Sequence, residues 1–198
     1  MIFIIGGESH TGKSLLAQNL LRKTSFPYLS LDLIKMGFVK LKNPPFKVDE
    51  DEKIANFFAP FLNNFIQSAL ENQQNYIIEG VYLRPKKLQK WLKNDECKIL
   101  FLFFSKAYIK QNYALIYEKE SVIERRVKSE FVDVKKLIKE HQKLKKKCKK
   151  FKMPFLEIKE NYEIKIPKAL EFLLNEGNNA KLIKKRVDYY CPLNSKSI

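Results

Sequence analysis

The sequence is poor in cysteine and histidine, with three Cys and two His among 198 residues. Cys97, Cys148 and Cys191 are far apart, odd in number and show no C-x-x-C spacing. Zinc sites and disulfide frameworks need such residues in close or paired positions. We therefore expect three reduced thiols, no cysteine-based metal site and a cytoplasmic location.

Long apolar runs are also absent. The longest candidate, residues 99–104, is much shorter than the roughly 20 residues of a membrane helix and is typical of a buried strand. The N-terminus has no basic segment ahead of its apolar residues and no cleavage site, which predicts that it is not a signal peptide. We expect no association with a membrane.

Acidic residues are in deficit, 22 against 38 Lys and Arg, so the formal net charge is +16. Residues 135–152 alone hold 10 Lys and a single acid, Glu140. Apolar residues and His141 recur in this segment at alternating steps of three and four, which predicts a helix with lysines around an apolar stripe. Two interpretations stay open, a solvated helix face or a surface for a polyanion such as nucleic acid. Base-stacking aromatic residues do not interleave with the lysines, which makes nucleic acid the weaker interpretation.

The most specific pattern lies near the N-terminus, where residues 7–14 read G-x-x-x-x-G-K-S. An apolar strand pattern precedes this segment and a helical pattern follows it. Strand, glycine-rich loop and helix in this order are typical of a nucleotide-phosphate site. The glycines allow backbone N–H groups to turn toward an anion, and the helix N-terminus adds further donors.

This motif predicts which residues hold ATP and Mg²⁺. Lys13 would contact the terminal phosphates during transfer, and the Ser14 hydroxyl would be a magnesium ligand. The expected nucleotide-binding residues are Gly7, Glu8, Ser9, His10, Thr11, Gly12, Lys13, Ser14 and Leu15.

Strand and helix patterns alternate along the chain, which is long enough for one α/β domain. The expected strands are residues 1–5, 28–31, 75–79, 97–104 and 154–158. The expected helices are residues 15–21, 49–72 with a kink at Pro60, 85–93, 106–130, 133–151 and 167–175. This alternation predicts right-handed β-α-β units and a parallel sheet, whose ligands bind beyond the carboxyl ends of the strands. Asp32 and Glu79 follow or end such strands and should share one cleft with the glycine-rich loop.

Two classes of nucleotide-hydrolysing protein are excluded by missing motifs. The chain has neither the N-K-x-D nor the D-x-x-G of a GTPase, and residues 100–104 lead into Ser105 rather than the acid of a motor-type ATPase. One acid after the second strand and arginines after the fourth are instead the parts of a phosphoryl-transfer kinase.

Three segments carry a resemblance to a known family. Residues 6–17 read G-G-x-x-x-T-G-K-S-L-L-A, residues 27–37 read P-Y-L-S-x-D-x-x-K-M-G, and residues 77–80 read I-I-E-G. Together they resemble a bacterial group of small P-loop kinases described as 2-phosphoglycerate-kinase-like or adenylate-kinase-related. More distantly, they are similar to the zeta-toxin kinases. The resemblance covers roughly residues 1–175.

The resemblance implies an α/β, three-layer P-loop NTPase fold with a five-stranded parallel sheet in the order 2-3-1-4-5 and a short helical lid. We expect a kinase domain at residues 1–176, with a lid at about 112–133 and a basic helix at about 134–151. A polar tail, residues 177–198, would follow.

The resemblance also implies roles for acidic and basic residues. Asp32 would accept the proton of the acceptor hydroxyl; holding a Mg²⁺-bound water, or capping a short helix at residues 33–36, stays open. Glu79 would contact either the acceptor or a Mg²⁺-bound water. Lys35 and Arg84 would meet an anionic group of the acceptor, with solvent exposure as the alternative for Lys35.

Arg125 and Arg126 are the only arginines between Arg84 and Arg186, and the planar guanidinium group of arginine suits the γ-phosphate. We expect one of the two to contact that phosphate, and pairing with Glu124 or Glu130 stays open for the other. The sequence thus predicts an ATP- and Mg²⁺-dependent kinase acting on a hydroxyl of a small, anionic acceptor. Two alternatives stay open. One is a zeta-type toxin kinase that phosphorylates a nucleotide sugar, whose antitoxin partner the sequence cannot reveal. The other is a nucleic-acid end kinase or RNA-binding NTPase.

Overall fold

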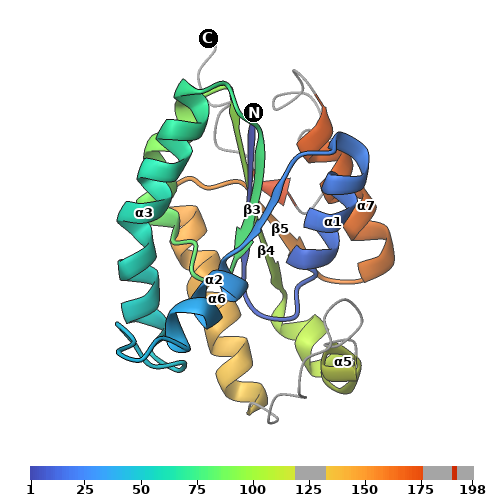
Figure 1. Cartoon of the computed structure of the whole chain (residues 1–198). Helices are drawn as coiled ribbons and strands as arrows, with labels where there is room; N and C mark the ends of the chain where they lie inside the picture. The colour runs from blue at the N-terminus through green and yellow to red at the C-terminus, as the bar shows by residue number, and fades with distance from the viewer. Residues whose placement is uncertain (119–132, 176–188, 191–198) are drawn as a thin grey trace.

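A six-stranded sheet forms the centre of the molecule, which is known here from a computed structural model that describes residues 1–118, 133–175 and 189–190 (Figure 1). The strands are β1 (Ile2–Gly7), β2 (Tyr28–Ser30), β3 (Tyr76–Gly80), β4 (Cys97–Phe104), β5 (Phe155–Ile158) and β6 (Tyr189–Tyr190). Their order is β2-β3-β1-β4-β5-β6, and the first five are parallel. The predicted order 2-3-1-4-5 is therefore confirmed. The sequence did not predict β6, which pairs antiparallel with β5.

Helices cover both faces of this sheet. They are α1 (Lys13–Thr24), α2 (Leu31–Val39), α3 (Asp51–Glu71), α4 (Pro85–Leu88), α5 (Lys106–Glu118), α6 (Val134–Lys150) and α7 (Tyr162–Leu174), with a 3₁₀ turn, η1 (Gln89–Lys93), after α4. In Figure 1, α3 and α6 lie on one side of the sheet and α1 and α7 on the other. None of the helices in the described ranges combines the length and the apolar character needed to cross a membrane.

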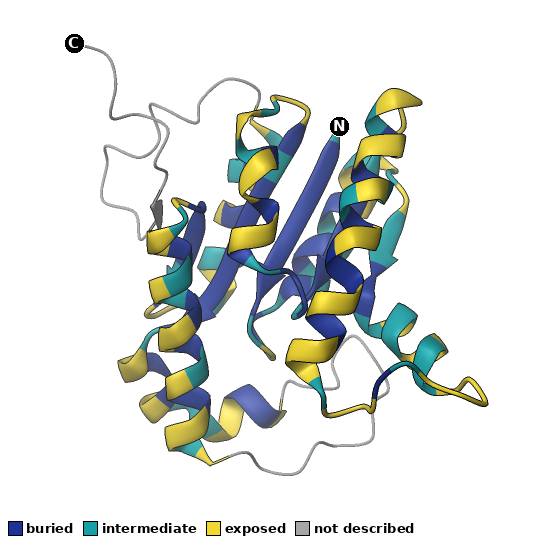
Figure 2. Cartoon of the chain, turned by 90° about the vertical axis from the view of Figure 1, so that its left-hand side faces the viewer, coloured by how far each residue is buried: buried dark blue, intermediate teal, exposed yellow. Residues whose placement is uncertain are grey.

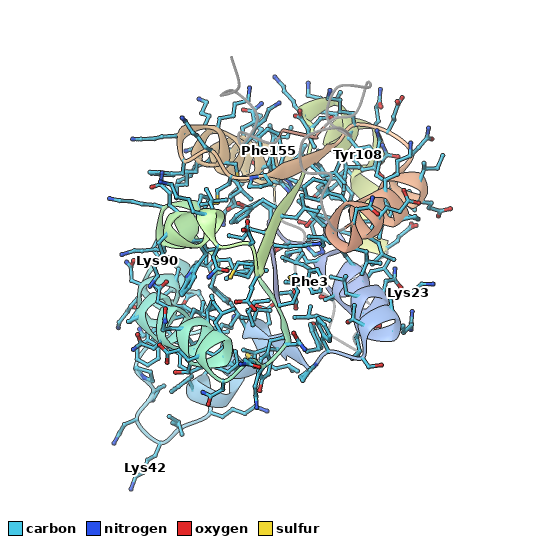
Figure 3. All side chains as sticks on the ribbon, turned by 90° about the horizontal axis from the view of Figure 1, so that it is seen from above. Phe3, Lys23, Lys42, Lys90, Tyr108 and Phe155 are labelled. Carbon is cyan, nitrogen blue, oxygen red and sulfur yellow. The ribbon has the colours of Figure 1, made fainter. Side chains whose placement is uncertain are left out.

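The strand β1 is buried on both faces because it lies between two apolar cores. Ile2 and Ile4 belong to the core under α3 and α6, whereas Phe3 and Ile5 belong to the core under α1, α5 and α7. Figure 2 shows the buried residues concentrated on the strands and the exposed residues on the outward faces of the helices. Seen from above in Figure 3, Phe3 lies inside, while Lys23, Lys42 and Lys90 point outward.

Two prolines lie inside helices: the sequence predicted that one helix continues through Pro60 with a kink, and that another starts at Pro167. The structure assigns one helix, α3, across Pro60. The helix α7 begins at Tyr162, whereas the sequence predicted a start at Pro167. Proline is common at the first helical position, which made Pro167 a natural start. Glu163, however, lies in the true first turn and suits the positive end of the helix dipole.

Most of the predicted lid lies outside the described residues. Residues 112–118 of it form the end of α5, and residues 119–132 are not described. The predicted basic helix is α6, with its N-cap at Asp133, whose side chain accepts a hydrogen bond from the Lys135 amide.

Candidate functional site

The glycine-rich loop joins the end of β1 to the start of α1 at the carboxyl edge of the sheet. Gly12 caps α1 with φ of 83°, a left-handed conformation that favours glycine. A Cβ atom added there would lie 1.9 Å from the hydroxyl oxygen of Tyr162. At Gly7, with φ of 148°, an added Cβ would lie 2.3 Å from the carbonyl oxygen of Leu102. Both conformation and space therefore require glycine at these two positions of the motif.

Two side chains fix the loop from inside. The ammonium group of Lys13, which is only 6 % exposed, donates to the carbonyl oxygen of Glu8 at 2.7 Å. The hydroxyl of Thr11 donates to the same oxygen at 2.8 Å. A buried cation thus lies within a loop of backbone donors at a helix N-terminus, which is the arrangement that binds phosphate groups.

Glu79 is the second-last residue of β3 and is fully buried, with 0 % exposure. Its Oε1 atom accepts hydrogen bonds from the hydroxyls of Tyr28 at 2.8 Å, Ser30 at 3.2 Å and Ser14 at 3.4 Å. Burial raises the pKa of Glu79, while the charge of Lys13 and the bond from Tyr28 oppose this shift. The carboxylate therefore connects the first turn of α1 to β2 and β3.

The sequence analysis missed Tyr28 and Ser30. Both lie on β2, which pairs in parallel with β3 so that Ser30 is opposite Glu79. Side chains two residues apart on a strand point to the same face, so positions 28 and 30 both face the carboxylate. Strand alternation next to Glu79 was the signal that would have indicated them.

The residues around Ser14 fit a hard cation that keeps most of its water. The second carboxylate oxygen of Glu79, Oε2, is buried and has no hydrogen-bond partner among the described residues. Hydroxyl and carboxylate oxygens are suitable ligands for Mg²⁺ and its bound water. No cluster of three or more His, Cys, Asp or Glu side chains suited to a metal occurs in the described ranges. The donor set therefore suits Mg²⁺ held mainly by phosphates and water.

A cavity of about 1070 Å³ opens beside the loop. Ser14, Lys13 and other loop residues form its floor, and α5 and the turn before α7 form its walls. Residues 159–161, which connect β5 to α7, and Tyr162, the first residue of α7, also line it. Asp32, Val81 and Glu140 also line this cavity, and we call these three residues the acceptor end, after the role that the sequence predicts for Asp32.

Asp32 lies in the first turn of α2, directly after β2. Ser30 occupies the N-cap position of this helix, so the open interpretation of Asp32 as the cap of a helix at residues 33–36 is wrong. The start of α2 packs against the end of β3, because a Cβ added at Gly80 would lie 2.7 Å from that of Leu31. Asp32 and Val81 follow these two residues and are thereby brought to the same edge of the sheet.

Lys35 does not line the cavity. Its ammonium group donates to the carbonyl oxygen of Val48 at 3.3 Å and lies 5.5 Å from the centre of the Tyr82 ring. Lys35 thus contacts the segment between α2 and α3.

Arg84 does not line the cavity either. Its guanidinium group donates to the carbonyl oxygens of Val81 at 2.9 Å and Asp51 at 3.4 Å, and its Nε atom lies 3.8 Å from a carboxylate oxygen of Glu52. This side chain ties the end of β3 to the start of α3. The two remaining predicted residues, Arg125 and Arg126, lie outside the described residues.

His141, on α6, is a further residue near the loop that the sequence analysis placed only on an apolar stripe. It is 1 % exposed, and its Nδ1 atom accepts a hydrogen bond from the Phe104 amide at 2.9 Å. Burial, followed by the charges of Lys13 and His10, lowers its pKa to about 3. The imidazole is therefore neutral at ordinary pH, and it joins the basic helix to the carboxyl end of β4.

Comparisons with known proteins identify the fold of the chain. No protein-family model and no curated protein matches the chain. Among solved structures, shikimate kinase from Acinetobacter baumannii in complex with shikimate is 14% identical, with a TM-score of 0.53 over 87% of this chain and 92% of that one. Deoxyadenosine kinase from M. mycoides is 13% identical, with a TM-score of 0.52 over 90% and 99% of the two chains. A gluconokinase from Sinorhizobium meliloti 1021 is 13% identical, with a TM-score of 0.50 over 86% and 90%. The chain therefore has the α/β P-loop NTPase fold found in these kinases.

Proposed function

We propose that this protein is an ATP- and Mg²⁺-dependent phosphotransferase that moves the γ-phosphoryl group of ATP to a hydroxyl of a small acceptor. One observation carries the proposal: the phosphate-type loop with its buried Lys13 and the carboxylate of Asp32 line the same cavity. A nucleotide and an acceptor would thus meet at the carboxyl edge of a parallel sheet, where such folds bind ligands. The kinase fold of the solved neighbours supports the same reaction class.

The loop supplies binding and electrostatic stabilisation. Its backbone N–H groups and the Lys13 ammonium group would hold the phosphates, and their positive charge would stabilise the charge that develops during transfer. Bound Mg²⁺ supplies charge neutralisation on the phosphates, and Ser14 with Glu79 are the residues that would hold it. Glu79 would fix the Ser14 hydroxyl in place.

Asp32 is the proposed general base. The acceptor oxygen bonds to the γ-phosphorus, the bond from that phosphorus to the bridging oxygen breaks, and its electron pair leaves with ADP. The acceptor proton passes to Asp32, because a carboxylate in hydrogen-bond reach of the hydroxyl can accept it as the new bond forms. The predicted phosphate contacts of Arg125 and Arg126 remain predictions, as does the lid that would carry them.

Two substitutions test the proposal. Lys13→Ala should abolish binding of a fluorescent ATP analogue and all ADP formation. Asp32→Asn should retain that binding and lower acceptor-dependent ADP formation by two or more orders of magnitude, a typical effect for a general base. Unchanged turnover in Asp32→Asn would show that the base is another residue, and unchanged nucleotide binding in Lys13→Ala would remove the proposed function.

The finer family hypotheses concern the acceptor. A 2-phosphoglycerate-kinase-like enzyme and a zeta-type toxin kinase would share the reaction and differ in what is phosphorylated. Expression in a bacterial host separates them, with Asp32→Asn as the control. Normal growth at equal accumulation of both proteins would exclude the toxin hypothesis.

The surface of α6 supports a second candidate function, polyanion binding by a nucleic-acid end kinase. The exposed lysines of this helix are Lys135, Lys136, Lys139, Lys143, Lys146, Lys149 and Lys150. They leave one long face of the helix strongly basic, and such a face attracts phosphate backbones.

A further inference from the structure

The acceptor end of the cavity is acidic. Two carboxylates line it, that of Asp32 from α2 and that of Glu140 from α6. The only Lys or Arg side chains that line the cavity within the described ranges are Lys13 and Lys159. Lys13 belongs to the glycine-rich loop, and Lys159 lies between β5 and α7, where Glu160 and Glu163 also line the cavity.

The basic residues near the acceptor end already have acidic or carbonyl partners. Arg84 is held by two backbone carbonyls and by Glu52. The ammonium groups of Lys143 and Lys147, on α6, lie 3.9 and 3.8 Å from the other carboxylate oxygen of Glu52. A single carboxylate at the start of α3 thus faces three cations, and none of the three lines the cavity.

The carboxylate of Glu140 interacts with those of Glu8 and Asp51, which lie near the acceptor end but do not line the cavity. Burial raises the pKa of Glu140; Lys136 opposes this shift, and the charge of Asp51 adds to it. Burial likewise raises the pKa of Glu8, which Lys13 opposes and which the charges of Glu140 and Asp51 increase. Carboxylates that repel in this way favour a positive charge among them, because it offsets both the repulsion and the loss of solvation.

We propose that the acceptor is a hydroxylated cation, an amino alcohol or amino sugar whose ammonium group meets the carboxylates of the acceptor end while its hydroxyl faces Asp32. This inference rests on the proposed phosphotransferase function and names the substrate class of that site. It replaces the sequence-based expectation of an anionic acceptor, which depended on Lys35 and Arg84 lying in the cavity. The transferred group, the broken bond and the proton path are those of the proposed reaction.

A charge series on one carbon chain tests the proposal. The probes are 1-amino-1-deoxyglucitol, glucitol and gluconate, which are a cationic, a neutral and an anionic molecule with nearly the same hydroxyl pattern. ADP release by the full chain with ATP and Mg²⁺ should give a kcat/KM for the amine at least about tenfold above that for gluconate. A tenfold ratio corresponds to about 1.4 kcal/mol, a modest value for a partly buried charge pair.

Matched variants assign this preference to the cavity. Glu140→Gln should reduce the ratio of amine to gluconate by about tenfold, and Glu140→Lys should reverse it. Glu171→Gln removes the same charge from an exposed position on α7 and should leave the ratio unchanged. A preference of the wild-type protein for gluconate, or equal effects of Glu140→Gln and Glu171→Gln, would overturn the proposal.

If none of the three polyols is turned over, the local electrostatic potential of the acceptor end can be measured without a bound substrate. Cationic and anionic nitroxides of the same size, aminomethyl-PROXYL and carboxy-PROXYL, report the local potential through the relaxation of backbone amide protons. The cationic probe should relax the amides of Asp32, Val81 and Glu140 more strongly than the anionic probe, although the chain carries a net charge of +16. The opposite order would overturn the proposal. Loss of the phosphotransferase function itself would appear separately, as ATP-analogue binding that does not depend on Lys13.

Discussion

Acid should destabilise this protein through one buried imidazole. The pKa of His141 is about 3 in the folded protein against an ordinary value of 6.5. Below pH 6.5, the unfolded chain binds a proton at this residue and the folded protein does not, so acid favours unfolding. At pH 5, which is one and a half units below the ordinary pKa, the free energy of unfolding should be about 2 kcal/mol lower than at pH 7.5.

The assay is urea unfolding at a series of pH values, in the wild-type protein and in His141→Asn. Asparagine keeps an oxygen acceptor near the position of Nδ1, where the Phe104 amide donates, and it does not titrate. The variant should be less stable at pH 7.5, because the smaller side chain leaves space against the Phe104 ring. Its stability should then fall by about 2 kcal/mol less than that of the wild type on going to pH 5.

The informative quantity is the difference between wild type and His141→Asn in how far the free energy of unfolding falls with pH. Glu8, Glu79 and Glu140 have raised pKa values, so each binds its proton more tightly in the folded state and gives a stability that is lost as the pH rises. These opposite contributions cancel between wild type and variant. The chain has only one other histidine, His10, and His10→Asn should keep a steeper slope than His141→Asn, because the buried His141 is still present. Parallel slopes in His141→Asn and the wild type would refute the account of a neutral, buried His141.

Three further predictions concern the loop, the buried carboxylate and the basic helix. Gly12→Ala should lose nucleotide binding, because the new Cβ would combine a φ of 83° with a 1.9 Å contact to Tyr162. Gly37→Ala in α2 is the control: no atom lies within 4 Å of the new Cβ, so the free energy of unfolding in urea should rise by up to about 1 kcal/mol. Tyr28→Phe should lower the free energy of unfolding by about 1–3 kcal/mol, because it removes the 2.8 Å hydrogen bond to Glu79. This loss should be smaller in a Glu79→Gln background, and equal losses in both backgrounds would show that the hydrogen bond contributes nothing. If α6 binds a polyanion, retention of single-stranded RNA should fall steeply between low and physiological salt, and a flat response would exclude that partner.

The parallel sheet was predictable from local patterns, whereas its strand order came from the family resemblance. The apolar strands, the glycine-rich loop and the alternation with amphipathic helices indicate a parallel sheet, and the family resemblance supplied the order that the structure confirms. The exact helix ends were less predictable. The start of α7 depends on Asn161, whose φ of 47° allows the chain to turn six residues ahead of Pro167.

The environment of each polar side chain was harder to predict, because it depends on residues far away in the sequence. Arg84 follows a strand that ends in the cleft, which suggested a contact with the acceptor. In the structure, it is held by the carbonyl oxygen of Asp51, more than 30 residues earlier. Likewise, Glu52 attracts lysines of α6 that the sequence could only describe as a basic helix. Partners of this kind appear only once the helices are packed.

The net charge of the protein and the charges inside the cavity would act on the two substrates in different ways. A net charge of +16 gives the protein a field that attracts anions, and in the proposed function Lys13 would be the local contact for the phosphates of ATP. An acceptor end with the same sign would compete for that nucleotide and repel a cationic acceptor. Asp32 and Glu140 would reduce this competition at the acceptor end, and Glu160 and Glu163 add negative charge elsewhere in the cavity. Two substrates of opposite charge would then be directed to the two ends of one cavity, with their reacting groups meeting between Lys13 and Asp32.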